Sequence, residues 1–416
     1  MDYYKEVKKP NPLWGKLLLF VISTYLHWKI DIFVSKNDTR SLNPPYLVLS
    51  NHVTYWDPFL VNMFIVEPIC YIAEMIYFRN IFFRFILNSV GSIPKKRYMK
   101  QYLPIKRLFQ AKNNGRIMGI FPEGERKWDG VTDLEGLQVI AKLIQKLRVP
   151  VITVKIKGGF LAYPRWAKHS RRGRVDLGYV LSLTKDEVCE LSLEQIAEKI
   201  RNHLSYDEMD YQRKEHNKYT GENLAENMEH LLYLCPHCHS YNTLFSTGNQ
   251  LSCQQCRYSV IYNQYGFLES LQGKLYFDNL RDWNQWQNQQ LKDLIVAKYT
   301  TKQGSKDILK DKDVAIYVGS IDQPFTYMEQ GDLCLNQHFL YFKHNERDKY
   351  QFGLAEITGL SVQFRAVLEF NYQDKMYQFK FKNPHLSAYK WMQALNLVQE
   401  EIKKQKCRKS LSEFLN

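Results

Sequence analysis

The chain has 416 residues, a length typical of two or three domains. Hydrophobic residues make up 45% of the sequence and charged residues 24%, which is the balance of a globular chain with a real core and not of a disordered one. The formal net charge is +14, which favours an anionic partner, either nucleic acid or an anionic membrane surface.

The N-terminal segment, residues 1–35, carries an apolar run between two tryptophans. Its start lacks a clean positive region and a cleavage site, so we expect no secretory signal. The run from Leu17 to Leu26 is too short to span a bilayer. Trp14 and Trp28 flank this run, each near a lysine, which is typical of an interfacial helix in the membrane plane or of a helix buried against the next domain.

Residues 36–210 are expected to form an α/β domain, because short apolar runs alternate with helical patterns. The runs predict strands over 46–50, 70–73, 116–121, 149–156 and 175–181. The helical patterns predict helices over 59–66, 78–89, 103–114 and 134–147, and an amphipathic helix over 192–204 that closes the domain.

The first polar feature follows the predicted strand 46–50. His52 lies where this strand ends, and Asp57 follows at the start of the next helix. A carboxylate in this place can hold the imidazole in one tautomer, so that the ring accepts a proton from a hydroxyl. The pair alone leaves open the simpler reading, a loop histidine capped by an aspartate.

Two later stretches carry further polar side chains. The segment Gly91–Arg97 ends in three adjacent cations that predict either a phosphate grip or a solvated basic loop. The predicted strand 116–121 ends in a Pro-Glu-Gly turn, which puts Glu123 at the crevice where α/β folds bind ligands. Glu123 then binds a substrate hydroxyl or orders the turn, and Arg126 binds phosphate or pairs with a neighbouring glutamate.

A basic cluster with one tryptophan follows the predicted strand 149–156. It spans residues 165–174 and contains five arginine and lysine side chains. We interpret it as a solvated loop or as a contact with anionic headgroups.

Four blocks occur in order along this domain: His52 with Asp57, Gly91–Arg97, Phe121–Arg126, and the strand Val149–Ile152 that contains Pro150. In order and spacing they resemble the four motif blocks of the glycerolipid acyltransferases. The resemblance is to a bacterial form of the 1-acyl-sn-glycerol-3-phosphate acyltransferases (lysophosphatidic acid acyltransferases), and it covers roughly residues 10–205, about half the chain.

The resemblance implies a role for each matched residue. His52 is expected to be the catalytic base and Asp57 its orienting partner. The acceptor-binding residues implied are Lys96, Arg97, Glu123, Gly124 and Arg126. The implied acceptor is lysophosphatidic acid and the implied donor is acyl-CoA or acyl carrier protein, with no catalytic cofactor. The family fold is an α/β domain preceded by two membrane-docking helices, which places the enzyme on the cytoplasmic face of the cell membrane as a peripheral or monotopic protein.

The chain departs from the family pattern beside the expected phosphate site. Glu125 stands where the third block usually has Thr or Ser, and Lys95 and Lys96 stand where many members carry apolar or acidic residues. Both departures leave the catalytic pair intact and put the identity of the acceptor in question.

The chain has eight cysteines, and four of them form two Cys-x-x-Cys pairs beyond a polar linker over 211–230. Cys235 and Cys238 are separated from Cys253 and Cys256 by 14 residues, the spacing of a zinc ribbon, here assigned to 231–270. Four thiolates close the coordination shell, so we expect a structural zinc ion. Few basic residues lie near the ribbon, which makes nucleic acid an unlikely ligand, and an insertion that stiffens the link between two larger domains is the simplest role.

The rest of the chain predicts a helical connector over 271–312, with a helix at 279–300, and a mainly-β domain over 313–416. Many short alternating runs followed by one helix at 386–405 resemble a pleckstrin-homology-like barrel in pattern alone.

Two functions are compatible with the whole sequence. The first is a membrane-surface acyltransferase acting on lysophosphatidic acid, another lysophospholipid or glycerol 3-phosphate. The second is a zinc-ribbon binding or scaffold protein in which the acyltransferase half is secondary.

Overall fold

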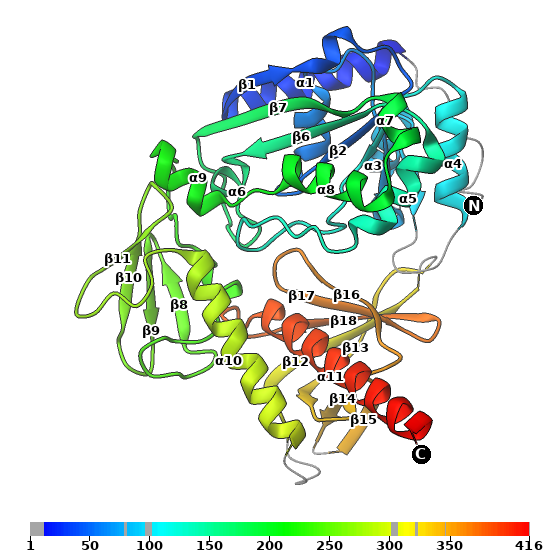
Figure 1. Ribbon diagram of the computed structural model, residues 1–416. Coiled ribbons are helices and arrows are strands. Elements are labelled where there is room, and N and C mark those ends of the chain that lie inside the picture. The colour runs from blue at the N-terminus through cyan, green and yellow to red at the C-terminus, as the bar shows by residue number, and fades with distance from the viewer. Residues whose placement is uncertain are drawn as a thin grey trace. The chain divides into compact units, whose positions relative to one another are not determined.

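The computed structural model describes residues 12–78, 81–95, 102–300, 307–320, 323–345 and 347–415. The chain forms two compact units (Figure 1). Unit 1 comprises residues 1–224 and 263–266, and unit 2 comprises residues 225–262 and 267–416.

A seven-stranded mixed sheet with the order β1-β7-β6-β2-β5-β3-β4 forms the centre of unit 1 (Figure 1). Its strands are β1 (Asp31–Asn37), β2 (Leu47–Ser50), β3 (Cys70–Glu74), β4 (Ile93–Lys95), β5 (Met118–Ile120), β6 (Val151–Lys157) and β7 (Arg174–Leu183). Strand β2 is parallel to both of its neighbours, β5 and β6. The segments that follow these three strands therefore leave the sheet at the same edge, where α/β folds place their ligands.

Apolar helix faces cover this sheet. One core is shared by the strands with α4 (Tyr102–Asn113), α5 (Leu137–Leu147), α7 (Lys185–Glu190) and α8 (Leu193–Leu204). Helix α8 begins at a capping box, in which the side chains of Ser192 and Gln195 each accept a hydrogen bond from the other's backbone N–H. Helix α1 (Pro12–Lys29) contacts α2 (Asp57–Asn62) and α3 (Ile81–Ser89). Two shorter helices, α6 (Gly159–Ala162) and α9 (Glu208–Glu215), complete the α-helices of unit 1 in the described part of the chain.

The α/β architecture predicted for this domain is confirmed, and its predicted strands and helices recur with small shifts of their ends. Two strands were not predicted, β4 and β1: α1 ends at Lys29, and residues 31–37 form β1 instead of extending the N-terminal helical segment. Strand β1 is a half-exposed edge strand that pairs with β7, which lies 143 residues later along the chain. None of the described helices combines the length and the apolar character needed to cross a membrane.

Unit 2 contains two antiparallel sheets and two long helices (Figure 1). The smaller sheet consists of β8 (Leu244–Thr247), β9 (Gln250–Cys253), β10 (Ser259–Tyr262) and β11 (Leu268–Ser270). The larger, with the order β15-β14-β13-β12-β18-β17-β16, consists of β12 (Leu309–Gly319), β13 (Thr326–Leu335), β14 (Phe339–His344), β15 (Arg347–Gly353), β16 (Thr358–Gln363), β17 (Val367–Tyr372) and β18 (Lys375–Phe381). Helices α10 (Leu280–Thr300) and α11 (Ala388–Leu415) contact each other. The predicted mostly-β region with a C-terminal helix is confirmed; its pleckstrin-homology-like identity stays a prediction.

The segment before the small sheet, residues 231–242, is hydrogen-bonded to α10 and to β12 of unit 2. The indole Nε1 of Trp283 on α10 donates to the carbonyl oxygen of Leu234 over 3.0 Å, and the Gln287 side chain donates to the carbonyl oxygen of Leu231 over 2.8 Å. The amide of Asn242 donates to a carboxylate oxygen of Asp311 on β12 over 2.7 Å. The cysteine-bearing region and the large sheet therefore belong to one compact unit.

Candidate active site

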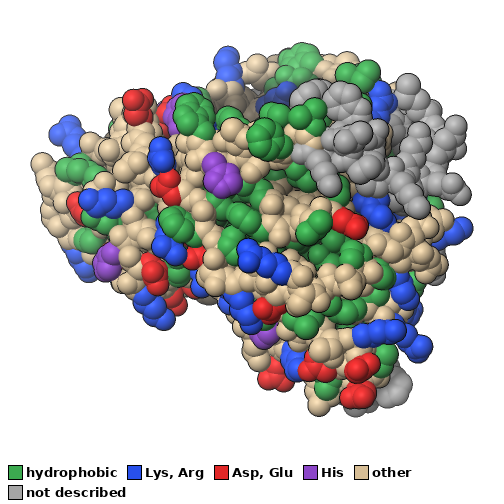
Figure 2. All heavy atoms as spheres, turned by 90° about the horizontal axis from the view of Figure 1, so that it is seen from above, with side chains coloured by type: hydrophobic (Ala, Val, Ile, Leu, Met, Phe, Trp, Pro, Cys, Tyr) green, Lys and Arg blue, Asp and Glu red, His purple; other side chains and the backbone are tan. Residues whose placement is uncertain are grey.

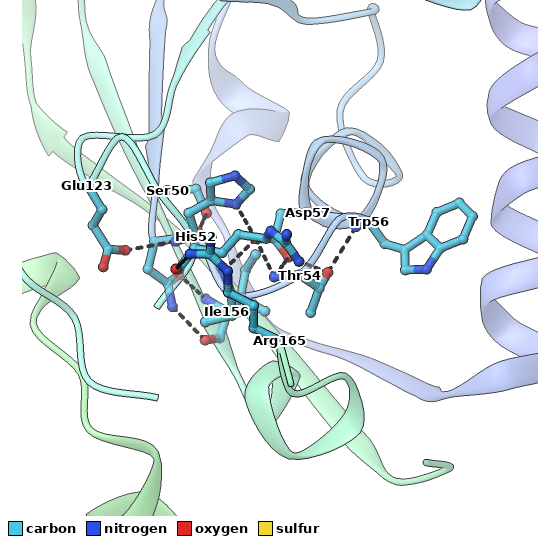
Figure 3. A network of polar contacts seen from close by, with 11 residues as sticks. Ser50, His52, Thr54, Trp56, Asp57, Glu123, Ile156 and Arg165 are labelled. Carbon is cyan, nitrogen blue, oxygen red and sulfur yellow. Dashed lines mark hydrogen bonds and ion pairs between the residues drawn. The ribbon is translucent and has the colours of Figure 1, made fainter. Parts of the chain in front are cut away.

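A histidine–aspartate pair lies at the edge of the unit 1 sheet where β2 ends (Figure 3). Nδ1 of His52 is 2.7 Å from Oδ2 of Asp57. A carboxylate oxygen can only accept, so Nδ1 carries the hydrogen and the neutral ring presents Nε2 as an acceptor. The Asp57 side chain is fully buried, whereas the His52 side chain is 21% exposed. The pair can therefore accept a proton from a group arriving on the exposed side of the ring.

The local fold explains why Asp57 stays in place without water. Both of its carboxylate oxygens accept backbone N–H bonds from the loop after His52, from Val53 at 2.6 Å and from Thr54 at 2.9 and 3.0 Å. The Thr54 hydroxyl donates a further bond over 2.7 Å, and Trp56 N–H donates to that hydroxyl in turn. These donors offset the cost of burying a carboxylate and fix the direction in which it meets the imidazole.

The segment around His52 contacts the neighbouring strands on both sides of β2. Asn51, fully buried, exchanges two hydrogen bonds with the backbone of Ile156 on β6, at 2.9 and 2.8 Å. The His52 ring stacks on Phe121 with ring centroids 4.3 Å apart, and Phe121 stacks on Tyr71. The first block is thus attached to the neighbouring strands on both sides.

Gly159, the first residue of α6, shows how closely the segment after β6 approaches this loop. A Cβ atom at Gly159 would lie 2.8 Å from a methyl carbon of Val53, closer than carbon atoms pack. This glycine was not singled out in the sequence, and its Gly-Gly context after a predicted strand was the available signal.

Glu123 connects the third block to the first. Its carboxylate accepts the backbone N–H of His52 over 2.8 Å and that of Asp133 over 3.2 Å. Burial raises the pKa of Glu123 to about 7, and these two N–H bonds and the nearby Lys127 oppose that rise. Gly124 follows in the left-handed region with φ 71°, which the tight turn after Phe121 requires. Of the two roles considered for Glu123, ordering the turn is the one these bonds describe.

Glu125 and Arg126 point to different partners. Glu125 is 3.4 Å from the guanidinium of Arg165, which is nearly fully buried, stacks over Trp128 and donates to the Arg126 carbonyl oxygen over 2.6 Å. The unusual glutamate of this block is therefore the counter-charge of a buried arginine. Arg165 was predicted only as part of a basic cluster, since nothing in the sequence marks a contact across 40 residues.

The arginine of the third block lies over the ring of Tyr55. The guanidinium carbon of Arg126 is 3.3 Å from the ring centroid. Tyr55 belongs to the loop between His52 and Asp57, so the third block and the first block touch at this point. The two remaining predicted phosphate ligands, Lys96 and Arg97, lie outside the described residues, directly after β4.

The structure brings the four predicted metal ligands of unit 2 together. The Sγ atoms of Cys235, Cys238, Cys253 and Cys256 all lie within 4.8 Å of one another. Two of these cysteines are buried and two are half-buried, so the cluster lies near the surface of the small sheet. The set could hold a metal ion.

Part of unit 1 is similar to known proteins. Residues 31–157 match the family model described as Acyltransferase. Among solved structures, the chain is similar to the 1-acyl-sn-glycerophosphate (LPA) acyltransferase PlsC from Thermotoga maritima, with 19% identity, a TM-score of 0.39, and coverage of 45% of this chain and 78% of that chain. No curated protein matches the sequence. The predicted resemblance to the acyltransferases is confirmed for residues 31–157, which contain the His52 and Glu123 blocks.

Proposed function

We propose that the chain is a membrane-surface enzyme that transfers a fatty acyl group from acyl-CoA or acyl carrier protein to the free hydroxyl of lysophosphatidic acid, giving phosphatidic acid. The observation that carries this proposal is the 2.7 Å contact between the exposed imidazole of His52 and the fully buried carboxylate of Asp57. It stands in a domain that matches the acyltransferase family model.

The pair supplies a general base without a covalent acyl-enzyme. Nε2 of His52 takes the proton of the acceptor hydroxyl while that oxygen attacks the thioester carbonyl carbon. The C–S bond then breaks, and the departing thiolate receives the proton held on Nε2. Asp57 holds the ring in the required tautomer and stabilises the imidazolium that forms between the two steps.

The acceptor phosphate is assigned to Arg126 together with Lys96 and Arg97. Arg126 has no carboxylate in ion-pair contact among the described residues, so its charge is available to an anion. Glu125 is directed to Arg165, which removes the main objection to a phosphate in this place. Glycerol 3-phosphate and other lysophospholipids carry the same phosphate and are the alternative acceptors.

Membrane attachment is assigned to a patch of exposed apolar residues on unit 1, here called the apolar patch. It consists of Leu17, Phe20, Val21 and Trp28 on α1 and Ile81 and Phe85 on α3, each at least half exposed. Figure 2 looks down on the side where α1 lies in Figure 1 and shows hydrophobic side chains gathered on this face with Lys and Arg around them. Residues 1–224 hold 35 Lys and Arg against 23 Asp and Glu, a net of +12, so most of the charge that attracts anionic lipid lies on the acyltransferase unit. We place the protein on the cytoplasmic face of the cell membrane, bound peripherally or as a monotopic protein.

The cysteine cluster of unit 2 is proposed to hold one structural zinc ion. Zinc binds thiolate sulfur at about 2.3 Å in a tetrahedron, which sets neighbouring sulfurs about 3.8 Å apart. The Sγ atoms are 3.7 Å apart in two pairs, Cys235 with Cys256 and Cys238 with Cys253, which supports this assignment. The strand order β15 to β12 followed by β18 to β16, with α11 after the last strand, supports the pleckstrin-homology-like proposal for the large sheet.

Product formation tests the proposed reaction. Wild type and His52→Ala are incubated in detergent micelles with lysophosphatidic acid and a labelled acyl thioester, first acyl-CoA and then acyl carrier protein. Phosphatidic acid from wild type alone is the expected result. Absence of product with every donor and with the other lyso-acceptors would overturn the transferase proposal and favour the binding or scaffold function.

Vesicle flotation tests the membrane assignment separately. Phe20→Glu is expected to reduce flotation with anionic vesicles, because it puts a carboxylate at a site meant to enter the lipid. Val139 on α5 is 70% exposed and supplies the matched control, Val139→Glu. Equal flotation of the two variants would contradict the assignment.

A further inference from the structure

The contact between Tyr55 and Arg126 joins two segments that the proposed reaction uses for different purposes. Tyr55 lies three residues after His52 and is 46% exposed. Arg126 lies two residues after the turn glycine, Gly124, and its guanidinium carbon is 3.3 Å from the centroid of the Tyr55 ring. This distance places the planar guanidinium against the face of the ring.

Stacking of this kind engages only the face of the guanidinium. Its N–H donors lie in the plane and point outward, so the edge that can bind two oxygens of a phosphate stays available. A free arginine side chain loses rotamer freedom when it binds a ligand, at a cost of about 0.5–1.5 kcal/mol. The ring of Tyr55 removes much of this cost before the acceptor arrives.

The backbone of Arg126 is fixed by a second contact. The buried guanidinium of Arg165 donates to the Arg126 carbonyl oxygen over 2.6 Å and is itself held by Trp128 and Glu125. Arg126 is therefore anchored at its backbone by one residue and at its side chain by another.

We infer that Tyr55 is a positioning residue that sets the specificity of the site for a phosphate-bearing acceptor, by holding the guanidinium of Arg126 beside the His52 loop with its edge free for the phosphate. This inference rests on the proposed function and names a determinant of acceptor recognition within the first block. The ring face of Tyr55, and not its phenolic oxygen, positions the guanidinium of Arg126.

Binding of glycerol 3-phosphate, measured by titration calorimetry, tests the inference without requiring turnover. Tyr55→Leu is expected to weaken binding about 3- to 10-fold, the fold-change that corresponds to the rotamer cost above. Tyr55→Phe retains the ring and is expected to bind nearer to wild type than to Tyr55→Leu. In an Arg126→Gln background, adding Tyr55→Leu is expected to have no further effect, because the two side chains act as one unit.

The control is a second arginine–aromatic pair in unit 1. The guanidinium carbon of Arg174 is 4.3 Å from the ring centroid of Phe33, which is 45% exposed on β1. Phe33→Leu removes a ring of the same kind outside the site and is expected to leave glycerol 3-phosphate binding unchanged.

Steady-state kinetics with lysophosphatidic acid provides the second measurement. Tyr55→Leu is expected to raise KM for this acceptor by a similar factor, with kcat changed far less. Equal binding by Tyr55→Leu and wild type, a full additional loss in the Arg126→Gln background, or a loss confined to kcat would each overturn the inference. If wild type forms no product yet binds glycerol 3-phosphate in a Tyr55-dependent way, the proposed reaction fails and the positioning role stands.

Discussion

The two units each contain a buried carboxylate paired with a basic side chain at 2.7 Å, His52 with Asp57 in unit 1 and Lys390 with Asp311 in unit 2. In both pairs the carboxylate is buried and accepts several additional hydrogen bonds. They differ in the base: the His52 side chain is 21% exposed, whereas the Lys390 side chain is 1% exposed.

That difference separates the pair proposed to react with substrate from a pair enclosed in the core. The imidazole leaves its second nitrogen on the partly exposed side, whereas the buried Lys390 donates to Asp311 and to the Asn242 amide oxygen. Burial lowers the pKa of Lys390, and the adjacent Asp311 carboxylate opposes that change. The distance between the charged groups is 2.7 Å in both pairs, so the exposure of the basic side chain is what distinguishes them.

The largest expected effect concerns the cysteine cluster that shares unit 2 with the Lys390 pair. Removing the metal with a chelator is expected to abolish hydrogen-exchange protection in the small sheet, because structural zinc contributes about 10–16 kcal/mol in zinc-finger peptides. The Cys238→Ser variant should lose one zinc ion per chain by elemental analysis, and His237→Ala, which changes a neighbouring histidine, should keep it. A metal-free wild type with full protection would contradict the structural role.

In the His52–Asp57 pair, removing the imidazole is expected to have a large effect on turnover. His52→Ala is expected to lower kcat by about 10²- to 10⁴-fold, the usual contribution of a general base, with little change in thermal stability. His203 bonds the Ser182 hydroxyl in the same unit, and His203→Ala is the matched control for removing an imidazole. Comparable losses in both variants would show that the effect comes from the fold and not from proton transfer.

The structural pair should respond through stability. Lys390→Met is expected to destabilise unit 2 by about 3–5 kcal/mol, because it leaves the Asp311 carboxylate buried without its counter-charge. Adding Asp311→Asn should recover part of that loss. Region-resolved hydrogen exchange measures both effects, and Lys380→Met supplies a control on β18, where the ammonium lies 4.2 Å from the Tyr317 ring centroid. If Lys390→Met left the stability of unit 2 unchanged, the structural role of the Lys390–Asp311 pair would be contradicted.

The smallest expected effect concerns a third buried carboxyl group and the pH dependence of stability that it causes. Glu208 in unit 1 is fully buried, and burial raises its pKa to about 8, against an ordinary value of 4.5, while bonds from Tyr206 and Phe160 oppose the rise. The folded protein therefore binds more protons than the unfolded chain between these two values, so stability falls as pH rises through this window. Glu208 alone is expected to contribute a loss of about 2–3 kcal/mol between pH 5 and pH 7.

Glu208→Gln removes the titrating group and should flatten this pH dependence, which urea unfolding at several pH values measures. Exposed Glu215 on the same helix supplies the control, Glu215→Gln, which should leave the slope unchanged. An unaltered slope in Glu208→Gln would assign the pH dependence to other groups.

Most of the elements, and the main members of both candidate sites, were predictable from the sequence. Hydrophobic periodicity located the parallel strands and their helices, because apolar side chains repeat along a strand or a helix face wherever it is buried. The four cysteines were found by their spacing, and His52, Asp57 and Glu123 were found because short sequence blocks resemble the acyltransferase motifs. Strand β1 was not predicted, because a half-exposed edge strand shows little periodicity of apolar residues.

Only the tertiary structure decided how the charged residues are paired. Glu123 meets the backbone of His52 because β2 and β5 are adjacent and parallel, so their ends meet at one edge of the sheet. Glu125 contacts Arg165, whereas its neighbour Arg126 contacts Tyr55. The two side chains leave the tight turn in different directions. Pairings of this kind join segments 40 to 71 residues apart, and no local pattern in a single sequence specifies them.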